Sequence, residues 1–187
     1  MERLAPVTPV QVKAPGKWQI ATVKSIKVET DAWGFRIDGM VDREREWTWK
    51  EFHELPFDTV PCDIHCVTKW SKLGTSFSGV SVDTLLEGTE PRGSFAMAYS
   101  YGGSTTNLPL ADLTGGKAWV VTEWEGEPLP REHGGPARLL VPHLYFWKSA
   151  KWVAGLRVMD HDEPGFWEQN GYHNRGDPWK EQRYWTD

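Results

Sequence analysis

The sequence predicts an α+β fold that is mainly β sheet with short helices. Several segments are rich in β-branched and aromatic residues or alternate apolar with polar residues, as strands do. Two polar residues stand where they would begin short helices. The 187 residues include 39% hydrophobic residues, and we find no repeat, linker or low-complexity tract. We therefore expect a single domain that spans residues 1–187.

The N-terminal part, residues 1–32, is expected to be an arm followed by strands. Three prolines among residues 1–15, with valines between them, favour an extended arm that packs as an edge rather than a helix. Residues 18–28 and 33–41 are β-favouring and are interrupted by Gly34 and Gly39. We predict two or three strands in these segments.

Two short helices are predicted from their N-terminal caps. Thr48 and Glu51 have the spacing of a capping box, in which each side chain binds the backbone amide of the other. This helix should end before Pro56. Ser81 is a second N-cap, because Val80 and Leu85 occupy the two positions of a hydrophobic staple around it.

The second half of the chain is expected to add more strands and an ordered coil. Residues 95–101 and 117–124 read as strands, and residues 125–128 read as a hairpin turn toward Leu129. A further strand pair is predicted at residues 138–141 and 151–159. Residues 160–187 show little periodicity but are too aromatic for disorder, so we expect them to wrap over the domain.

Charge and composition exclude several classes of function. The net charge of −5 disfavours binding to nucleic acid or to an anionic membrane surface. The N-terminus shows no export signal and no segment is long and apolar enough to span a bilayer, so we expect a cytoplasmic protein. The 12 Trp residues outnumber both the 7 Phe and the 5 Tyr taken separately, an excess that a simple core would not need.

Cys66 is the first candidate for chemistry. Its thiolate would be favoured by Lys69 nearby and would serve as a soft metal ligand or a nucleophile. From spacing alone, a buried cysteine on a strand is the simpler interpretation. A zinc site built from Cys62, Cys66 and nearby histidines is disfavoured, because the spacing is loose and no second ligand pair follows.

A carboxylate-free basic segment is the second candidate. Residues 133–159 contain no Asp or Glu but include Arg138, Lys148, Lys151 and Arg157. In an acidic protein this segregation indicates a local anion site. Residues 133–138 place small residues where a backbone would approach a ligand closely, with a cationic side chain at the end. A solvated cationic face is the alternative, although the neighbouring Trp residues make full exposure costly.

Three motifs together resemble a known family. They are Asp-Ile-His-Cys-Val-Thr-Lys-Trp-Ser at 63–71, Asn-Leu-Pro-Leu at 107–110, and the stretch from Glu-His-Gly-Gly-Pro-Ala-Arg to Lys-Ser-Ala-Lys-Trp at 132–152. From about Trp33 onward the chain resembles the sulfite oxidase family of molybdopterin enzymes, and most of all its small bacterial members. The resemblance implies the molybdopterin-binding domain fold and a molybdenum-molybdopterin cofactor.

The resemblance also implies roles for individual residues. Cys66 matches the cysteine that binds molybdenum beside the dithiolene sulfurs of the pterin. His133 and Arg138 match residues that bind the pterin and its phosphate, and Lys148, Ser149 and Lys151 match residues that close over the same group, while Ser100 matches a further pterin contact approximately. The polar residues expected to border an open metal position are His65, Lys69, Tyr101, His143 and Tyr145. Trp70, Trp124 and Trp147 would form aromatic walls.

The chain departs from sulfite oxidases proper. The arginines that follow the ligand cysteine there are replaced here by Val67, Thr68, Lys69 and Trp70. The resemblance therefore implies two-electron chemistry, usually oxygen-atom transfer, on a small molecule other than sulfite, such as an S-oxide or N-oxide. It also implies a separate flavin- or iron–sulfur-dependent reductase as the electron-transfer partner.

Two other functions compete with this interpretation. A Trp-rich ligand-binding module would present indole rings on one open face, and a Cys-His hydrolase would pair Cys66 with His143 or His133. For the tail from Gly165 to Trp185, we favour attachment of the C-terminus to the domain over a docking surface for the electron-transfer partner.

Overall fold

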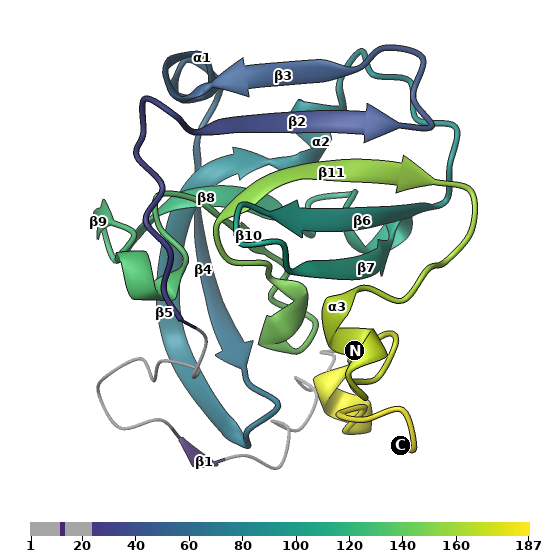
Figure 1. The fold of residues 1–187 in the computed structure, drawn as a ribbon. Helices are drawn as coiled ribbons and strands as arrows, with labels where there is room; N and C mark the ends of the chain where they lie inside the picture. The colour runs from purple at the N-terminus through teal and green to yellow at the C-terminus, as the bar shows by residue number, and fades with distance from the viewer. Residues whose placement is uncertain (1–11, 14–23) are drawn as a thin grey trace, which may run out of the picture.

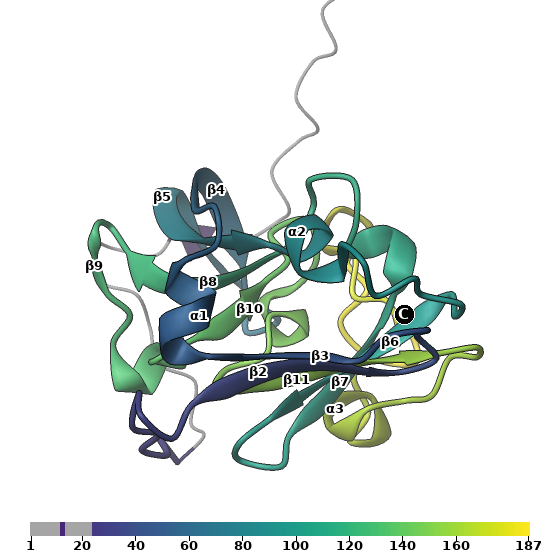
Figure 2. The same ribbon diagram turned by 90° about the horizontal axis from the view of Figure 1, so that it is seen from above.

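A computed structural model describes residues 12–13 and 24–187 of the chain. They form two β-sheets with three short α-helices and four 3₁₀ turns, which lie between the strands and in the C-terminal segment. Figure 2 shows the sheets as two layers, with β2, β3 and β11 in one and β8 and β10 in the other. The predicted fold class, mainly β with short helices, is confirmed. Within the described residues, no helix is both long and apolar enough to cross a bilayer.

One sheet has the strand order β3-β2-β11-β6-β7 and is antiparallel except for the parallel pair β2 and β11 (Figure 1). Its strands are β2 (Gly34–Gly39), β3 (Arg45–Thr48), β6 (Phe95–Ser100), β7 (Thr105–Pro109) and β11 (Val153–Met159).

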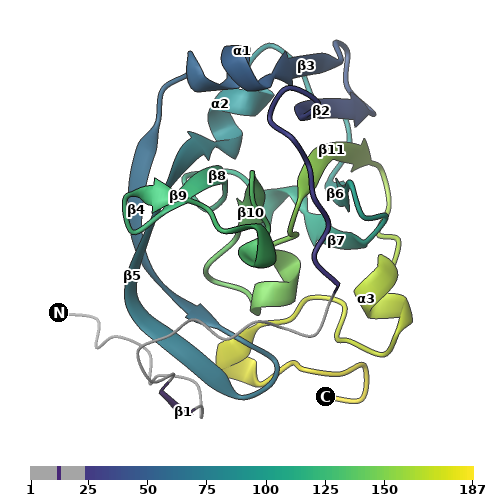
Figure 3. The ribbon, with the colours of Figure 1, turned by 60° about the vertical axis from the view of Figure 1, so that its left-hand side comes forward.

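The other sheet is built around a long hairpin. In it β5 pairs with β4 on one side and with β8 on the other, while β10 and the short β9 both pair with β8. Figure 3 shows the hairpin of β4 and β5 reaching beyond the rest of the domain toward the C-terminal segment. The strands are β1 (Val12–Lys13), β4 (Asp58–His65), β5 (Trp70–Ser81), β8 (Trp119–Trp124), β9 (Glu127–Pro128) and β10 (Arg138–Leu140).

Both faces of β8 and β10 are covered, which places two hydrophobic clusters back to back. Successive strand residues point to opposite faces. Val120 and Leu139 accordingly belong to a large cluster with residues of the other sheet, whereas Val121 and Leu140 belong to a smaller one with strands β4 and β5. Arg138 lies two positions before Leu140 and therefore points to the face of the smaller cluster.

The predicted helix caps are confirmed. Helix α1 (Trp49–His53) begins after Thr48, whose hydroxyl accepts the Glu51 amide at 3.3 Å while the Glu51 carboxylate accepts the Thr48 amide at 2.9 Å. Helix α2 (Val82–Leu86) begins after Ser81, whose hydroxyl accepts the Thr84 amide at 3.1 Å. Both signals are local in sequence, because a cap and its partner are only three residues apart.

The predicted turn after β8 is also confirmed. Glu125 and Gly126 both have positive φ angles, 52° and 80°, and join β8 to β9 in a two-residue hairpin. Such hairpins favour left-handed conformations at both central positions, because these match the twist of the paired strands. Glycine adopts this conformation without steric cost.

Two predicted strand arrangements are wrong. The segments at 138–141 and 151–159 do form strands, but β10 pairs with β8 and β11 pairs with β2 and β6, so they lie in different sheets. Residues 24–29 form no strand, because the side chain of Arg131 binds the backbone carbonyls of Ser25 and Ile26. The expected edge is seen at β1, which pairs with β5. The rest of the arm and predicted strand residues 18–23 lie outside the described residues.

Candidate functional site

Cys66 lies in the four-residue loop, 66–69, that joins β4 to β5. Its amide donates to the Trp70 carbonyl at 2.9 Å, its own carbonyl accepts the Lys69 amide at 3.1 Å, and Lys69 takes a positive φ of 66° to close the turn. The Thr68 hydroxyl donates to the Cys66 sulfur at 3.1 Å. The thiol is half-buried and packs against the smaller hydrophobic cluster. The loop therefore holds a partly accessible sulfur beside an apolar wall.

Cys62 differs from Cys66 in its surroundings. It lies within β4, where burial raises the pKa of its thiol to about 12. A thiol with so high a pKa stays protonated at neutral pH and is a poor nucleophile and metal ligand. Of the two cysteines, Cys66 is therefore the one placed for chemistry.

Two basic side chains, Arg138 and Lys151, lie near Cys66, and His133 lies beside them. Arg138 is 1% exposed, and burial lowers its pKa to about 9, while the negative charge of a Cys66 thiolate acts in the opposite direction. Burial and the neighbouring Arg138 lower the pKa of Lys151 to about 8, and Cys66 again opposes the shift. Burial, Arg138 and Lys151 together lower the pKa of His133 to about 4. Positive groups that repel one another in a buried place are stabilised by an anion.

The backbone around this basic cluster fixes the direction of its cations. The Arg138 guanidinium donates to the carbonyls of His133 and Ser149, each at 2.7 Å, and lies 3.9 Å from the centre of the Phe146 ring. The Lys151 ammonium donates to the Glu132 carbonyl at 2.8 Å. These contacts join the turn at 131–134 to the segment at 146–151.

The two glycines of this turn are needed because another part of the chain, rather than a ligand, lies close to their backbone. Gly134 has a φ of 105°, and a Cβ atom there would lie 3.0 Å from the Lys151 Cα atom. A Cβ at Gly135 would lie 2.1 Å from the Leu129 carbonyl oxygen. The expectation that small residues mark close approach of the backbone holds, but the close neighbour of each is another part of the chain.

Lys148 and Ser149 make contacts of another kind. The Lys148 ammonium is fully buried, lies 2.7 Å from the Glu168 carboxylate, and donates to the carbonyls of Asn107 and Asn174 at 2.7 and 2.6 Å. The Ser149 hydroxyl accepts the Val141 amide at 2.8 Å. Ser149 thus meets the basic cluster through its carbonyl, whereas the Lys148 ammonium is engaged by an internal carboxylate.

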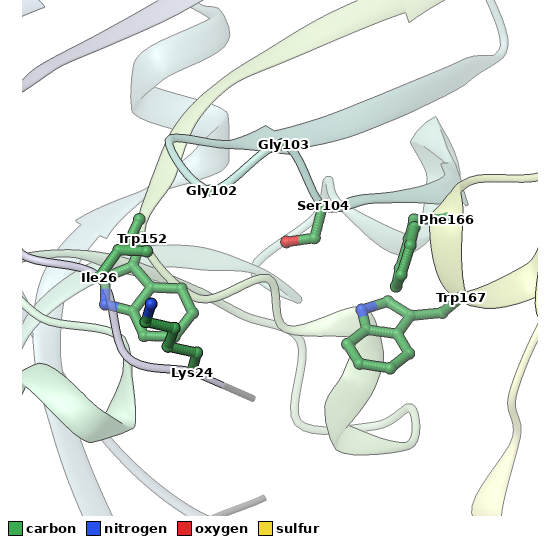
Figure 4. Close-up of a pocket in the computed structure, with 8 residues that line it drawn as sticks. All are labelled: Lys24, Ile26, Gly102, Gly103, Ser104, Trp152, Phe166 and Trp167. Atoms are coloured by element: carbon green, nitrogen blue, oxygen red, sulfur yellow. The ribbon is translucent and has the colours of Figure 1, made fainter. Parts of the chain in front are cut away.

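Ser100 ends β6 beside a pocket of about 420 Å³. The Ser100 hydroxyl is buried and makes no hydrogen bond within the described part of the chain. Figure 4 shows Trp152 and Trp167 facing one another across the pocket, with the turn after Ser100 above them. Trp152 follows Lys151, so this wall of the pocket adjoins the basic cluster. The lining residues are Lys24, Ile26, Gly102, Gly103, Ser104, Trp152, Phe166 and Trp167.

The polar residues predicted to border a metal position are dispersed. His65 precedes the Cys66 loop and Lys69 is its last residue, and the His65 ring binds the Ser71 hydroxyl at 2.7 Å. The Tyr101 hydroxyl accepts a hydrogen bond from the Gly34 amide and donates one to the Gly34 carbonyl at the start of β2. The roles of His65, Lys69 and Tyr101 at the metal stay predictions, as do those of His143 and Tyr145.

His143 and Tyr145 lie on the segment that follows β10. His143 binds the carboxylate of Asp112 at 3.2 Å. Tyr145 is fully buried, and its ring lies 4.8 Å from the guanidinium carbon of Arg183, which also reaches the Cys66 loop. Tyr145 is therefore joined to the loop through another side chain.

Most of the tryptophans in the described part of the chain are buried or half-buried, which argues against an open stacking face. Trp33, Trp47, Trp70 and Trp152 are buried, whereas Trp179 and Trp185 are 39% and 76% exposed. Of the three expected aromatic walls, Trp70 and Trp124 pack on the smaller cluster, and Trp124 meets the His133 ring edge-on. Trp147 stacks on Tyr145 and donates to Glu168.

Sequence reasoning missed the contribution of the C-terminal segment to this site. The Arg183 guanidinium donates to the Val67 carbonyl at 2.9 Å. Burial and Tyr184 raise the pKa of Tyr172, and the Tyr172 ring is close enough to Cys66 for a thiolate there to add to the shift. Trp179 lies edge-on to His65. The aromatic content of the tail indicated that it packs, as we expected, but no local pattern indicated that it packs on the Cys66 loop.

The residues present fit a molybdopterin cofactor. A half-buried thiol is a soft ligand for a transition metal. Cations with pKa values lowered by burial, together with the unsatisfied Ser100 hydroxyl, match a phosphate-bearing organic group. The described residues thus offer one metal-binding sulfur and one anion-binding cluster in the same region.

Comparisons with known proteins agree. The family model for the oxidoreductase molybdopterin binding domain matches residues 9–167. The chain is 41% identical to the uncharacterized oxidoreductase YuiH of Bacillus subtilis, over 83% of this chain and 79% of that protein. It is 30% identical to the "Putative protein-methionine-sulfoxide reductase subunit YedZ1" of Azospira oryzae, over 77% of this chain and 56% of that protein.

More distant similarity extends to larger proteins. The chain is 34% identical to the mitochondrial sulfite oxidase of Drosophila melanogaster, in a match that covers 40% of this chain and 13% of that protein. Its fold matches the sulfane dehydrogenase SoxCD of Paracoccus pantotrophus with a TM-score of 0.68 and 20% identity, over 79% of this chain and 42% of that chain. The chain therefore belongs to the sulfite oxidase family of molybdopterin-binding oxidoreductases, whose cofactor is molybdenum-molybdopterin.

Proposed function

We propose that the protein uses Cys66 to ligate molybdenum and transfers an oxygen atom to or from a small molecule, with an S-oxide or N-oxide as substrate rather than sulfite. The observation that carries the proposal is the position of Cys66, which is half-buried against the smaller hydrophobic cluster and close to Arg138 and Lys151. Burial lowers the pKa of both cations, and the charge of a Cys66 thiolate opposes that shift. This arrangement supports one ligand for the metal and two cations for the phosphate of its pterin.

Each side chain has a defined task in this proposal. Cys66 binds the metal, and the Thr68 hydroxyl, 3.1 Å from its sulfur, stabilises the thiolate by a hydrogen bond. Arg138 and Lys151 neutralise the phosphate. His133, with its pKa of about 4, stays neutral at physiological pH and offers a hydrogen bond rather than a charge.

The bound cofactor supplies the two-electron change and the oxygen-atom transfer, for which water is the source or the product. The chain supplies the walls of the site. Val67 lies in the Cys66 loop, Trp70 follows it, and both are largely buried, so they limit the access of water on that side. Lys69 is exposed and carries the one charge among the four residues that follow Cys66, so an anionic substrate would find fewer cations here than the arginines expected in sulfite oxidases proper.

An S-oxide substrate and a separate reductase have independent support. The Azospira relative is named as a subunit of a methionine-sulfoxide reductase, and its chain is similar to this one over 149 residues. We therefore propose that electrons are exchanged with a flavin or iron–sulfur partner on a separate chain.

The experiment combines metal analysis with turnover. Purified protein should contain molybdenum and release a fluorescent oxidised pterin, and reduced viologen dye should be oxidised by S-oxides. Cys66→Ser should retain pterin and lose turnover, while the matched variant Cys62→Ser should keep both. Oxidation of sulfite without reduction of any S-oxide or N-oxide would overturn the substrate assignment, and full activity of Cys66→Ser would overturn the role of the thiol.

A further inference from the structure

The C-terminal segment contacts the loop that carries Cys66 through the side chain of Arg183. Arg183 is 117 residues from Cys66 in sequence, yet its guanidinium donates to the Val67 carbonyl at 2.9 Å and lies 3.5 Å from the Cys66 carbonyl. The residue is 5% exposed. It also lies beyond residue 167, where the match to the family model ends. This contact is therefore made by a part of the chain that the matched domain does not include.

The loop depends on an external donor at this point. Its internal hydrogen bonds involve the amide and carbonyl of Cys66 and leave the Val67 carbonyl to Arg183. Val67 itself is 7% exposed, so its carbonyl has little access to water. A buried carbonyl that loses its donor is costly, and a hydrogen bond from a charged donor is stronger than one from a neutral donor. Arg183 is thus a strong constraint on the loop backbone.

The guanidinium is held in place from several sides. Its carbon lies 4.8 Å from the centre of the Tyr145 ring, and Nη2 lies 3.5 Å from the Glu181 carboxylate. The Asp187 carboxylate accepts the Arg183 backbone amide at 2.9 Å, and the Arg183 carbonyl accepts the His173 amide. A planar guanidinium that is stacked and backbone-anchored in this way has few alternative positions. The tail therefore presents a rigid donor to the loop.

We propose that Arg183 is a positioning residue for the metal ligand: it clamps the Cys66–Val67 backbone and so keeps the Cys66 sulfur directed toward the basic cluster. The inference rests on the proposed role of Cys66 as the molybdenum ligand. It adds that the tail, outside the matched domain, controls the mobility of that ligand. Removing the clamp should leave pterin binding in place and change the exposure and orientation of the sulfur.

The first test uses the full-length chain from a host that cannot make molybdopterin. The protein is treated with iodoacetamide, and peptide mass spectrometry gives the alkylation rate of Cys66 relative to Cys62 in the same molecule. Because a hydrogen bond from a charged donor is lost, Arg183→Gln should raise this ratio about tenfold. Arg175→Gln is the matched control, since Arg175 is in the same tail but binds Asp112, and its ratio should equal that of the wild type.

Two further measurements keep the test decisive. Arg183→Lys retains the charge without the planar group, and a rise of about threefold is expected for it; it replaces Arg183→Gln if that variant does not fold. In cofactor-loaded protein, the electron paramagnetic resonance spectrum of Mo(V) should change in either variant at unchanged pterin content. A wild-type alkylation ratio in the variant that folds overturns the proposal. Absence of molybdenum from the wild type would instead overturn the proposed function, because the alkylation test needs no cofactor.

Discussion

Replacing Lys148 by methionine distinguishes an internal ion pair from a cofactor contact. Methionine nearly fills the space of the lysine stem, so the change removes a charge without leaving a large cavity. Lys148 and Glu168 have side chains that are 1% and 2% exposed, and their charged atoms lie 2.7 Å apart. If Lys148 instead neutralised the cofactor phosphate, its loss would lower pterin retention and leave the cofactor-free chain about as stable as before.

The size of the effect follows from what the variant leaves behind. Breaking a buried ion pair costs about 3 to 5 kcal/mol. Glu168 keeps two donors, Thr106 at 2.7 Å and Trp147 at 3.0 Å, which moves the cost toward the lower end. The carbonyls of Asn107 and Asn174 lose their donor, at about 1 kcal/mol each. We therefore expect the free energy of unfolding to fall by about 5 kcal/mol, a large part of the total stability of a domain.

The assay is urea denaturation of the cofactor-free chain at pH 7, followed by tryptophan fluorescence. The double variant Lys148→Met/Glu168→Leu removes both charges and should recover at least about half of the loss. Glu163→Gln is the control, because Glu163 is an exposed carboxylate near the same segment, and it should change stability by less than about 0.5 kcal/mol. A loss below about 1 kcal/mol for Lys148→Met would refute the reasoning.

Three more predictions concern the basic cluster. Arg138→Lys should lower the free energy of unfolding by at least about 2 kcal/mol and cause loss of pterin, because one ammonium cannot bind both carbonyls that Arg138 binds. Urea titration measures the first effect and pterin fluorescence the second. Wild-type values in both measurements would contradict the prediction. Gly134→Ala should be destabilised by about 1 to 3 kcal/mol through its positive φ and its contact with Lys151, and an unchanged melting temperature would count against this. In cofactor-free protein the pKa of His133 should be about 4, so stability should decline as the pH falls from 6.5 toward 4, because the unfolded chain binds the proton more readily there. Lys151→Met should raise that pKa in an NMR titration, and an imidazole that titrates near 6.5 in the wild type would be the contrary result.

Features with local causes were predictable from the sequence. The caps at Thr48 and Ser81 and the turn at Glu125 depend on neighbours within a few residues. The same holds for the thiol of Cys66, which follows β4, and for the basic segment, because both are properties of contiguous residues. Their combination with the family resemblance was enough to predict the fold class and the cofactor.

Features that depend on contacts between residues far apart in the sequence were not predictable. The strands at 138–140 and 153–159 follow each other in sequence, but each finds its partner in a different sheet. The stretch that forms β5 is rich in Ser, Gly and Thr and lacks clear alternation, so its length was not visible. Counting charges in residues 133–159 missed Glu168, which lies just outside that stretch and returns to pair with Lys148. Arg183 reaches the Cys66 loop from still farther away.

The most direct test of the central claim is X-ray absorption at the molybdenum edge, recorded for wild-type protein and for Cys66→Ser. If the Cys66 sulfur ligates the metal, the variant should show one fewer sulfur neighbour at unchanged pterin content. An identical sulfur shell in the two proteins would contradict the assignment.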